Sequence, residues 1–149
     1  MKYLVARLFA VVAFMTGGVH AADAGPVQVS HAWIRVLPGD LPAGGYAALR
    51  NAGDTPLALI GVQSPDYGQV MLHESSTHNG LSTMSVVERL MLPPHGVVKL
   101  APGGYHLMLM HALHPVKPGE QVKVTLHFAD GSSLDVEFLA RPANAGDDY

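Results

Sequence analysis

Histidine and methionine side chains recur at two places where strand geometry would bring them to a common face. From Tyr105 to Met110, alternation with a period of two puts His106, Met108 and Met110 on one face of a predicted strand. The aromatic and aliphatic residues between them then take the other face. This segment therefore predicts a strand with one face of metal-donor side chains and one face suited to a core.

The second place is a predicted hairpin around Asn79 and Gly80, a residue pair that strongly favours a two-residue turn. With these two residues in the loop, Ser75 lies opposite Met84 on the returning strand. His73 then becomes a diagonal neighbour of Met84 on the same face, roughly 7 to 8 Å away. The side chains of His73 and Met84 are long enough to bind the same ion across this distance.

A site built from His73, Met84, His106 and Met108 would combine two imidazoles with two thioethers. Thioether sulfur favours the soft ion copper(I) over zinc, calcium or magnesium, which prefer harder ligands. We therefore expect Cu(I) as the bound ion. Because the imidazoles must be neutral to bind it, the affinity should weaken in acid.

The composition excludes several other functions. The chain has 149 residues and a formal charge of −3, so it offers no basic face for nucleic acid. It contains no cysteine, which excludes thiol nucleophiles, iron–sulfur ligation and thiolate metal sites. No hydrolase motif and no convergent carboxylate pair is present, so a metal hydrolase or a copper-dependent oxidase is disfavoured and we expect no enzymatic activity.

The N-terminal residues have the three parts of a signal peptide. A basic start precedes the apolar run from Leu8 to Met15, and small residues follow up to Ala21. We expect a signal peptide at residues 1–21, cleaved after Ala21, and a mature protein outside the cytoplasm. The apolar run is short for a membrane span of about 20 residues, so a stable membrane anchor is the less favoured alternative.

The rest of the chain reads as short strands separated by Gly, Pro, Asn and Asp, which is typical of an all-β sandwich. We expect one domain over residues 22–140 and a flexible C-terminal tail over residues 141–149. The predicted strands are Val27–Val36, Gly45–Asn51, Leu57–Gln63, Gln69–Ser76, Leu81–Val87, Gly96–Leu100, Tyr105–Met110, Gln121–Phe128 and Ser133–Ala140.

The four donor residues have a distinctive spacing. Ten residues separate His73 from Met84, twenty-one separate Met84 from His106, and one separates His106 from Met108. This spacing resembles the signature of the periplasmic copper chaperones often called the PCu(A)C family. The flanking segments resemble that family too, over nearly all of residues 27–139: Ala32-Trp33-Ile34-Arg35, Gly45-Tyr46, Leu49-Arg50-Asn51, Leu92-Pro93-Pro94 and Pro102-Gly103-Gly104-Tyr105.

The resemblance implies a cupredoxin-like antiparallel β-sandwich of Greek-key type. It also implies a periplasmic protein that captures Cu(I) and passes it to the copper centre of a respiratory terminal oxidase. The expected partners are the copper-accepting domain of such an oxidase or another periplasmic copper chaperone. Two positions depart from the family pattern, Ser75, where a further methionine is frequent, and Ser85, where a basic residue is common. The tail also lacks a His- and Met-rich extension that could bind Cu(II).

Alternatives remain for the protein and for single residues. The protein could instead buffer toxic periplasmic copper, or it could be a metal-free scaffold in which the methionines only fill the core. Met71 and Met110 share the faces of His73 and His106, and packing or rim roles are favoured for them over copper binding. Glu74 could accept a hydrogen bond from a ligand imidazole, although an exposed carboxylate is the simpler interpretation.

Overall fold

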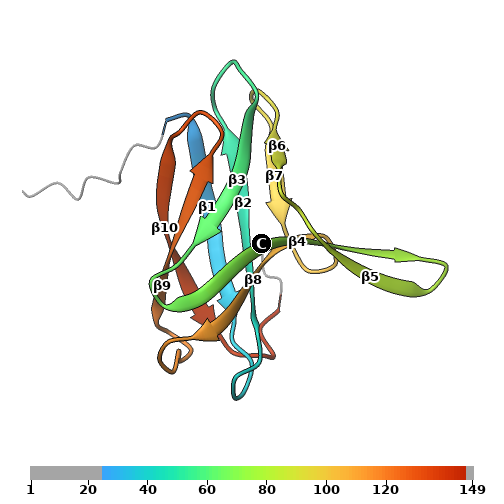
Figure 1. Cartoon of the computed structure of the whole chain (residues 1–149), viewed down its shortest axis with the longest axis vertical. Coiled ribbons are helices and arrows are strands. Elements are labelled where there is room, and N and C mark those ends of the chain that lie inside the picture. Colours follow the sequence, from blue (N-terminus) through green and yellow to red (C-terminus); the bar gives the residue numbers. More distant parts are fainter. Residues whose placement is uncertain (1–24, 147–149) are drawn as a thin grey trace, which may run out of the picture.

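The computed structural model describes residues 25–146, which form ten β-strands and no helix (Figure 1). The predicted signal peptide at residues 1–21 lies outside the described residues. Within the described part, no helix is long and apolar enough to cross a membrane. The strands are β1 (Val27–Arg35), β2 (Ala43–Asn51), β3 (Leu57–Gln63), β4 (Tyr67–His78), β5 (Leu81–Val86), β6 (Leu90–Leu92), β7 (Val97–Leu100), β8 (Tyr105–Ala112), β9 (Gln121–Phe128) and β10 (Ser133–Arg141).

The strands form one hydrogen-bonded path in the order β5-β4-β8-β2-β1-β10-β9-β3-β6, and β7 pairs with β2. Buried side chains from both halves of this path belong to one core cluster, for example Ile34 and Leu107 from one half and Leu59 and Phe138 from the other. The path therefore closes over a single core as a sandwich. The all-β sandwich that the sequence predicts is confirmed.

One strand pair departs from the predicted antiparallel arrangement. β1 and β10 run parallel, with Trp33 beside Leu139 and Ile34 beside Ala140. All the other strand pairs among residues 25–146 are antiparallel. The parallel pair joins the first strand to the last, and this contact links the two halves of the path.

The core follows the period of two that the sequence predicts. In β9, Val122, Val124 and Leu126 are buried while the residues between them are partly exposed. In β8, Leu107 and Leu109 are fully buried, which leaves His106, Met108 and Met110 on the opposite face. Each fully buried aliphatic side chain of this size stabilises the fold by about 1.5–3 kcal/mol, and this burial holds β8 in place.

The β4–β5 hairpin projects away from the sandwich, as Figure 1 shows in green. Its turn residues Asn79 and Gly80 have φ values of 51° and 77°, the left-handed pair that a type I′ turn requires. Every residue of β5 is exposed. The hairpin is thus an arm exposed to solvent, and its strand β4 pairs with β8.

Candidate metal centre

Two strand ladders place the four predicted donor residues. In the β4–β5 ladder, His78 pairs with Leu81 and Ser75 pairs with Met84, which is the predicted hairpin register. In the β4–β8 ladder, His73 pairs directly with His106. The structure therefore brings the hairpin and the β8 strand together through their two histidines.

The imidazole of His73 contacts two of the other predicted donors. Its Nδ1 lies 3.2 Å from the Met84 Sδ atom. Its ring centroid lies 5.8 Å from that of His106, with the two ring planes at 84°. Met108 is the next residue of β8 on the same face as His106, about 6.5–7 Å along the strand. The four side chains therefore occupy neighbouring positions on one sheet face.

The orientation of His106 is fixed by a backbone contact. This residue is buried, and its Nδ1 lies 3.0 Å from the carbonyl oxygen of Gly104. A carbonyl oxygen can only accept, so Nδ1 carries a proton, and in the neutral ring the lone pair is then on Nε2. The ring is thus held in the tautomer that can bind a metal through Nε2, an arrangement common among metal-binding histidines.

The sequence offers Glu74 as an acceptor for a ligand imidazole, although an exposed carboxylate is its simpler interpretation. Glu74 is adjacent to His73 in β4, so its side chain leaves the opposite face of the strand. No hydrogen bond between Glu74 and either imidazole is found within residues 25–146. The Gly104 carbonyl takes the orienting role for His106 instead.

The Nε2 atom of His73 is inaccessible to solvent and has no hydrogen-bond partner among the described residues. A buried imidazole nitrogen without a partner is destabilising, because its bond to water is lost and not replaced. The other nitrogen of the ring faces a thioether, which is a weak acceptor. Both ring nitrogens of His73 thus lack a strong hydrogen-bond partner in the protein, as expected for an imidazole that binds a ligand.

The donor set is soft. Among residues 25–146, no group of three or more His, Asp or Glu side chains is placed to hold a metal ion. A metal at this face would therefore need the methionine sulfurs, and thioethers favour copper(I). The residues present fit that ion and not zinc or calcium.

We expect the pKa of His73 to lie below 6.5 in solution. Burial lowers it, and the neighbouring His106 lowers it further. Because the unfolded chain takes up this proton at a higher pH than the folded chain, the free energy of unfolding should decrease as the pH falls through 6.5. A lowered pKa also keeps the imidazole neutral, and able to bind metal, in mildly acidic solution. NMR titration of the ring protons measures this pKa directly.

The variant His106→Ala tests whether His106 contributes to the lowered pKa of His73. Its His73 pKa should rise, because the unfavourable electrostatic interaction with the His106 ring is removed, yet stay below 6.5 because burial, the larger cause, remains in part. A His73 pKa at or above 6.5 in the unsubstituted protein would contradict this account.

The remaining histidines of the described residues lie elsewhere on the surface. The sequence predicts that they face solvent, and five are exposed while His127 in β9 is half-buried; the five are His31, His78, His95, His111 and His114. His95 has a surface partner, with its Nε2 atom 2.7 Å from an oxygen of Asp54. The sequence thus separated the two clustered histidines from the dispersed ones.

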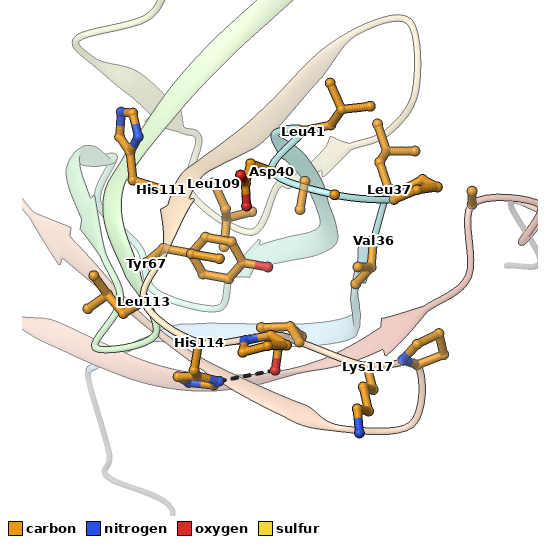
Figure 2. Close-up of a pocket in the computed structure, with 18 of the residues that line it drawn as sticks. Val36, Leu37, Asp40, Leu41, Tyr67, Leu109, His111, Leu113, His114 and Lys117 are labelled. Carbon is orange, nitrogen blue, oxygen red and sulfur yellow. Dashed lines mark hydrogen bonds between the residues drawn. The ribbon is translucent and has the colours of Figure 1, made fainter.

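A separate hollow lies where β4 begins and β8 ends, with a cavity volume of about 670 Å³. Figure 2 shows the Tyr67 ring within it, near Asp40 and Leu109. Burial raises the pKa of the Tyr67 phenol, and the Asp66 carboxylate raises it further, so the group stays protonated at neutral pH. None of the five methionines in residues 25–146 lines this hollow. It therefore lacks the sulfur donors of the face around His73.

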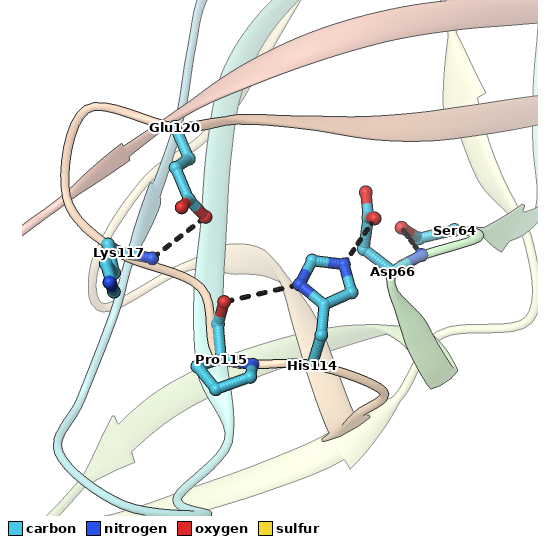
Figure 3. A network of polar contacts seen from close by, with 6 residues as sticks. All are labelled: Ser64, Asp66, His114, Pro115, Lys117 and Glu120. Atoms are coloured by element: carbon cyan, nitrogen blue, oxygen red, sulfur yellow. Dashed lines mark hydrogen bonds and ion pairs between the residues drawn. The ribbon is translucent and has the colours of Figure 1, made fainter.

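One wall of this hollow is fixed by an ion pair. The His114 Nε2 atom lies 2.8 Å from an Asp66 carboxylate oxygen, and its Nδ1 lies 3.2 Å from the Pro115 carbonyl oxygen (Figure 3). With acceptors at both nitrogens, the doubly protonated ring is favoured, and the pKa of His114 is raised, chiefly by Asp66. The contact joins the β3–β4 connection to the loop after β8.

The variant Asp66→Asn should lower the pKa of His114 toward 6.5, because the main cause of the raised pKa is removed. In the unsubstituted protein the stabilisation by this pair should be present below pH 6.5 and lost as the pH rises through the raised pKa. NMR titration of His114 measures the shift. Asp54→Asn, which changes the partner of His95, should leave His114 unaffected, and an unchanged His114 pKa in Asp66→Asn would contradict the assignment.

Comparison with known proteins places the chain in a family. Residues 27–140 match the family model described as "Putative lipoprotein LpqE-like". The protein named "Putative lipoprotein Lxx21020" from Leifsonia xyli subsp. xyli (strain CTCB07) is 35% identical over 111 residues. That alignment covers 74% of this chain and 66% of the relative, slightly less than two thirds of its length.

Solved structures show the same fold. The chain is 28% identical to the copper-bound PCuAC domain from PmoF2, with a TM-score of 0.67, and the match covers 79% of this chain and 94% of that domain. It is 29% identical to the solution structure of Cu(I)-bound DR1885 from Deinococcus radiodurans, with a TM-score of 0.62, covering 84% and 83% of the two chains. The family match extends over all ten strands but for the last residue of β10, and the chain belongs to the LpqE-like family of PCuAC-type domains.

Proposed function

We propose that this protein is an exported copper(I) metallochaperone that binds one Cu(I) ion through His73, Met84, His106 and Met108. The observation that carries the proposal is the direct pairing of His73 with His106 while the Met84 sulfur lies 3.2 Å from the His73 ring. Two of the solved structures similar to this chain are described as copper-bound, which supports the same ion here.

The charge of the site supports Cu(I) rather than Cu(II). All four donors are neutral when the imidazoles are deprotonated, so a monovalent ion brings a single charge into the site. Thioethers stabilise the softer, reduced ion. The activity is then binding and transfer of copper, and it requires no group placed for catalysis.

The exposure of one donor supports transfer to another protein. The Met84 side chain is 52% exposed and lies on the projecting hairpin, whereas His106 is only 7% exposed. An incoming ligand from a partner can therefore displace Met84 first while His106 still holds the ion. We propose that the acceptor is the copper centre of a respiratory terminal oxidase, or a second chaperone that serves it.

We also propose a periplasmic location. The basic, apolar and small-residue parts of residues 1–21 support export, with cleavage after Ala21. The lipoprotein descriptions of the matching family and of the curated relative are consistent with an exported protein.

Transfer of bound Cu(I) to the isolated, metal-free copper domain of a terminal oxidase tests the proposed function. The protein is loaded with one equivalent of Cu(I) under reducing conditions, mixed with the acceptor, separated, and assayed for copper in each fraction. We expect most of the copper in the acceptor. Full retention of copper by the donor would contradict delivery and favour a copper buffer, and failure to load would favour a metal-free scaffold.

A further inference from the structure

The methionines of the described residues are unevenly distributed. Residues 25–146 contain five, and four of them project from the outer face of the β5–β4–β8 part of the sheet, leaving Met91 in β6 as the exception; the four are Met71, Met84, Met108 and Met110. The proposed copper site uses two of these four. Met71 and Met110 are therefore thioethers beside the site that it does not employ.

The ladder places these two sulfurs around Met108. Met71 pairs directly with Met108, so their Cβ atoms are about 4.5–5.5 Å apart. Met110 is the next outward position of β8, about 6.5–7 Å beyond Met108. It is a diagonal neighbour of Met71, at about 7–8 Å, because Gln69 pairs with Met110. Three flexible thioether arms can meet at one point at these spacings.

Core packing does not account for these residues. None of Met71, Met108 and Met110 belongs to the buried core cluster or to the partly buried hydrophobic side chains packed against it. The Met71 sulfur instead accepts a contact from the Gln69 side-chain nitrogen, at 3.3 Å. This polar contact places the sulfur on the outer face, on the side of Gln69.

We infer that a methionine cluster, made of Met71, Met108 and Met110, forms a second, weaker Cu(I) position. Met108 belongs both to this methionine cluster and to the four-residue site. The inference rests on the proposed function. The ion moves between the two positions with its bond to Met108 retained: its bonds to His73, Met84 and His106 break as bonds to Met71 and Met110 form, and it remains Cu(I) throughout. The cluster thus extends the site along β8, away from the hairpin.

Titration with silver(I), a redox-inert mimic of Cu(I), tests the inference. With the methionine methyl groups labelled with carbon-13, each sulfur reports separately by NMR. The first equivalent should shift the methyl signals of Met84 and Met108. The second equivalent should shift those of Met71 and Met110, while the signal of Met91 stays unchanged.

The double variant Met71→Leu/Met110→Leu tests the same inference by removing the two sulfur atoms. Leucine is close to methionine in volume, so the strand packing should persist. In competition with a coloured Cu(I) chelator, this variant should keep the first equivalent and bind the second at least about tenfold more weakly than the unsubstituted protein. Met91→Leu should bind both equivalents as the unsubstituted protein does.

The failures of the two proposals are distinguishable. Unmoved Met71 and Met110 signals through the second equivalent, or an unchanged titration of the double variant, would overturn the inference and leave the four-residue site intact. Unmoved Met84 and Met108 signals at the first equivalent would overturn the proposed function itself, and the inference with it.

Discussion

Replacing His106 by alanine is expected to lower the affinity for Cu(I) by about two orders of magnitude, which corresponds to about 2.7 kcal/mol. The variant removes the proposed donor, which is buried and contacts the Gly104 carbonyl through Nδ1, and no other described histidine pairs with His73 across the ladder. Competition with a coloured Cu(I) chelator under reducing conditions measures the loss. Met91→Ala, which removes a thioether from β6, should bind Cu(I) as tightly as the unsubstituted protein.

His106 is buried, so its replacement could also disturb the fold, and a companion variant separates the two effects. Met84 is half-exposed in a strand that is exposed throughout, so Met84→Ala should leave the thermal unfolding temperature nearly unchanged. It should still weaken Cu(I) binding measurably, because one sulfur donor is lost. Unchanged affinity in both His106→Ala and Met84→Ala would contradict the proposed ligands.

Replacing Leu107 by alanine is expected to lower the free energy of unfolding by about 2–5 kcal/mol. Leu107 is fully buried between the two proposed copper ligands of β8, which face outward, so its packing holds that strand against the core. Urea denaturation of the metal-free protein measures the change. Leu81→Ala, at an exposed position of the hairpin, should change the stability by no more than about 0.5 kcal/mol.

Copper should restore part of the stability that Leu107→Ala loses, because a ligand that binds the folded state alone stabilises it. The recovery should be much smaller in the double variant Leu107→Ala/His106→Ala, in which a principal donor is missing. Equal recovery in the single and double variants would show that the stabilising copper binds elsewhere.

Local features of the candidate site could be predicted from the sequence. The Asn79-Gly80 turn admits one favoured hairpin register, and that register alone puts His73 diagonal to Met84. Strand alternation likewise puts His106 and Met108 on one face. Each of these relations is set by residues within about a dozen positions of one another, where backbone geometry leaves little freedom.

The convergence of the two halves of the site could not be predicted from local patterns. His73 and His106 face each other because β4 pairs with β8, and alternation shows which residues form a strand but not which strands become neighbours. The resemblance in spacing indicated that His73 and His106 lie together, and the pairing of β4 with β8 explains this proximity in geometric terms. The parallel pairing of β1 with β10 escaped prediction for the same reason.

Two further features left almost no sequence signal. β6 has three residues, Leu90–Leu92, too few to display a period, and its two buried leucines are held by pairing with β3. The Gly104 carbonyl that orients His106 belongs to the backbone, and a backbone acceptor has no residue type to recognise. In contrast, Leu57–Gln63 and Gln121–Phe128 match their predicted bounds, because polar or turn-forming residues delimit each strand.

X-ray absorption at the copper edge of the Cu(I)-loaded protein tests the central claim most directly. With less than one equivalent of copper bound, the account predicts both nitrogen and sulfur neighbours around the ion, and a reduced sulfur contribution in Met84→Ala. A first shell of nitrogen and oxygen alone, unchanged in that variant, would contradict a copper site built from His73, Met84, His106 and Met108.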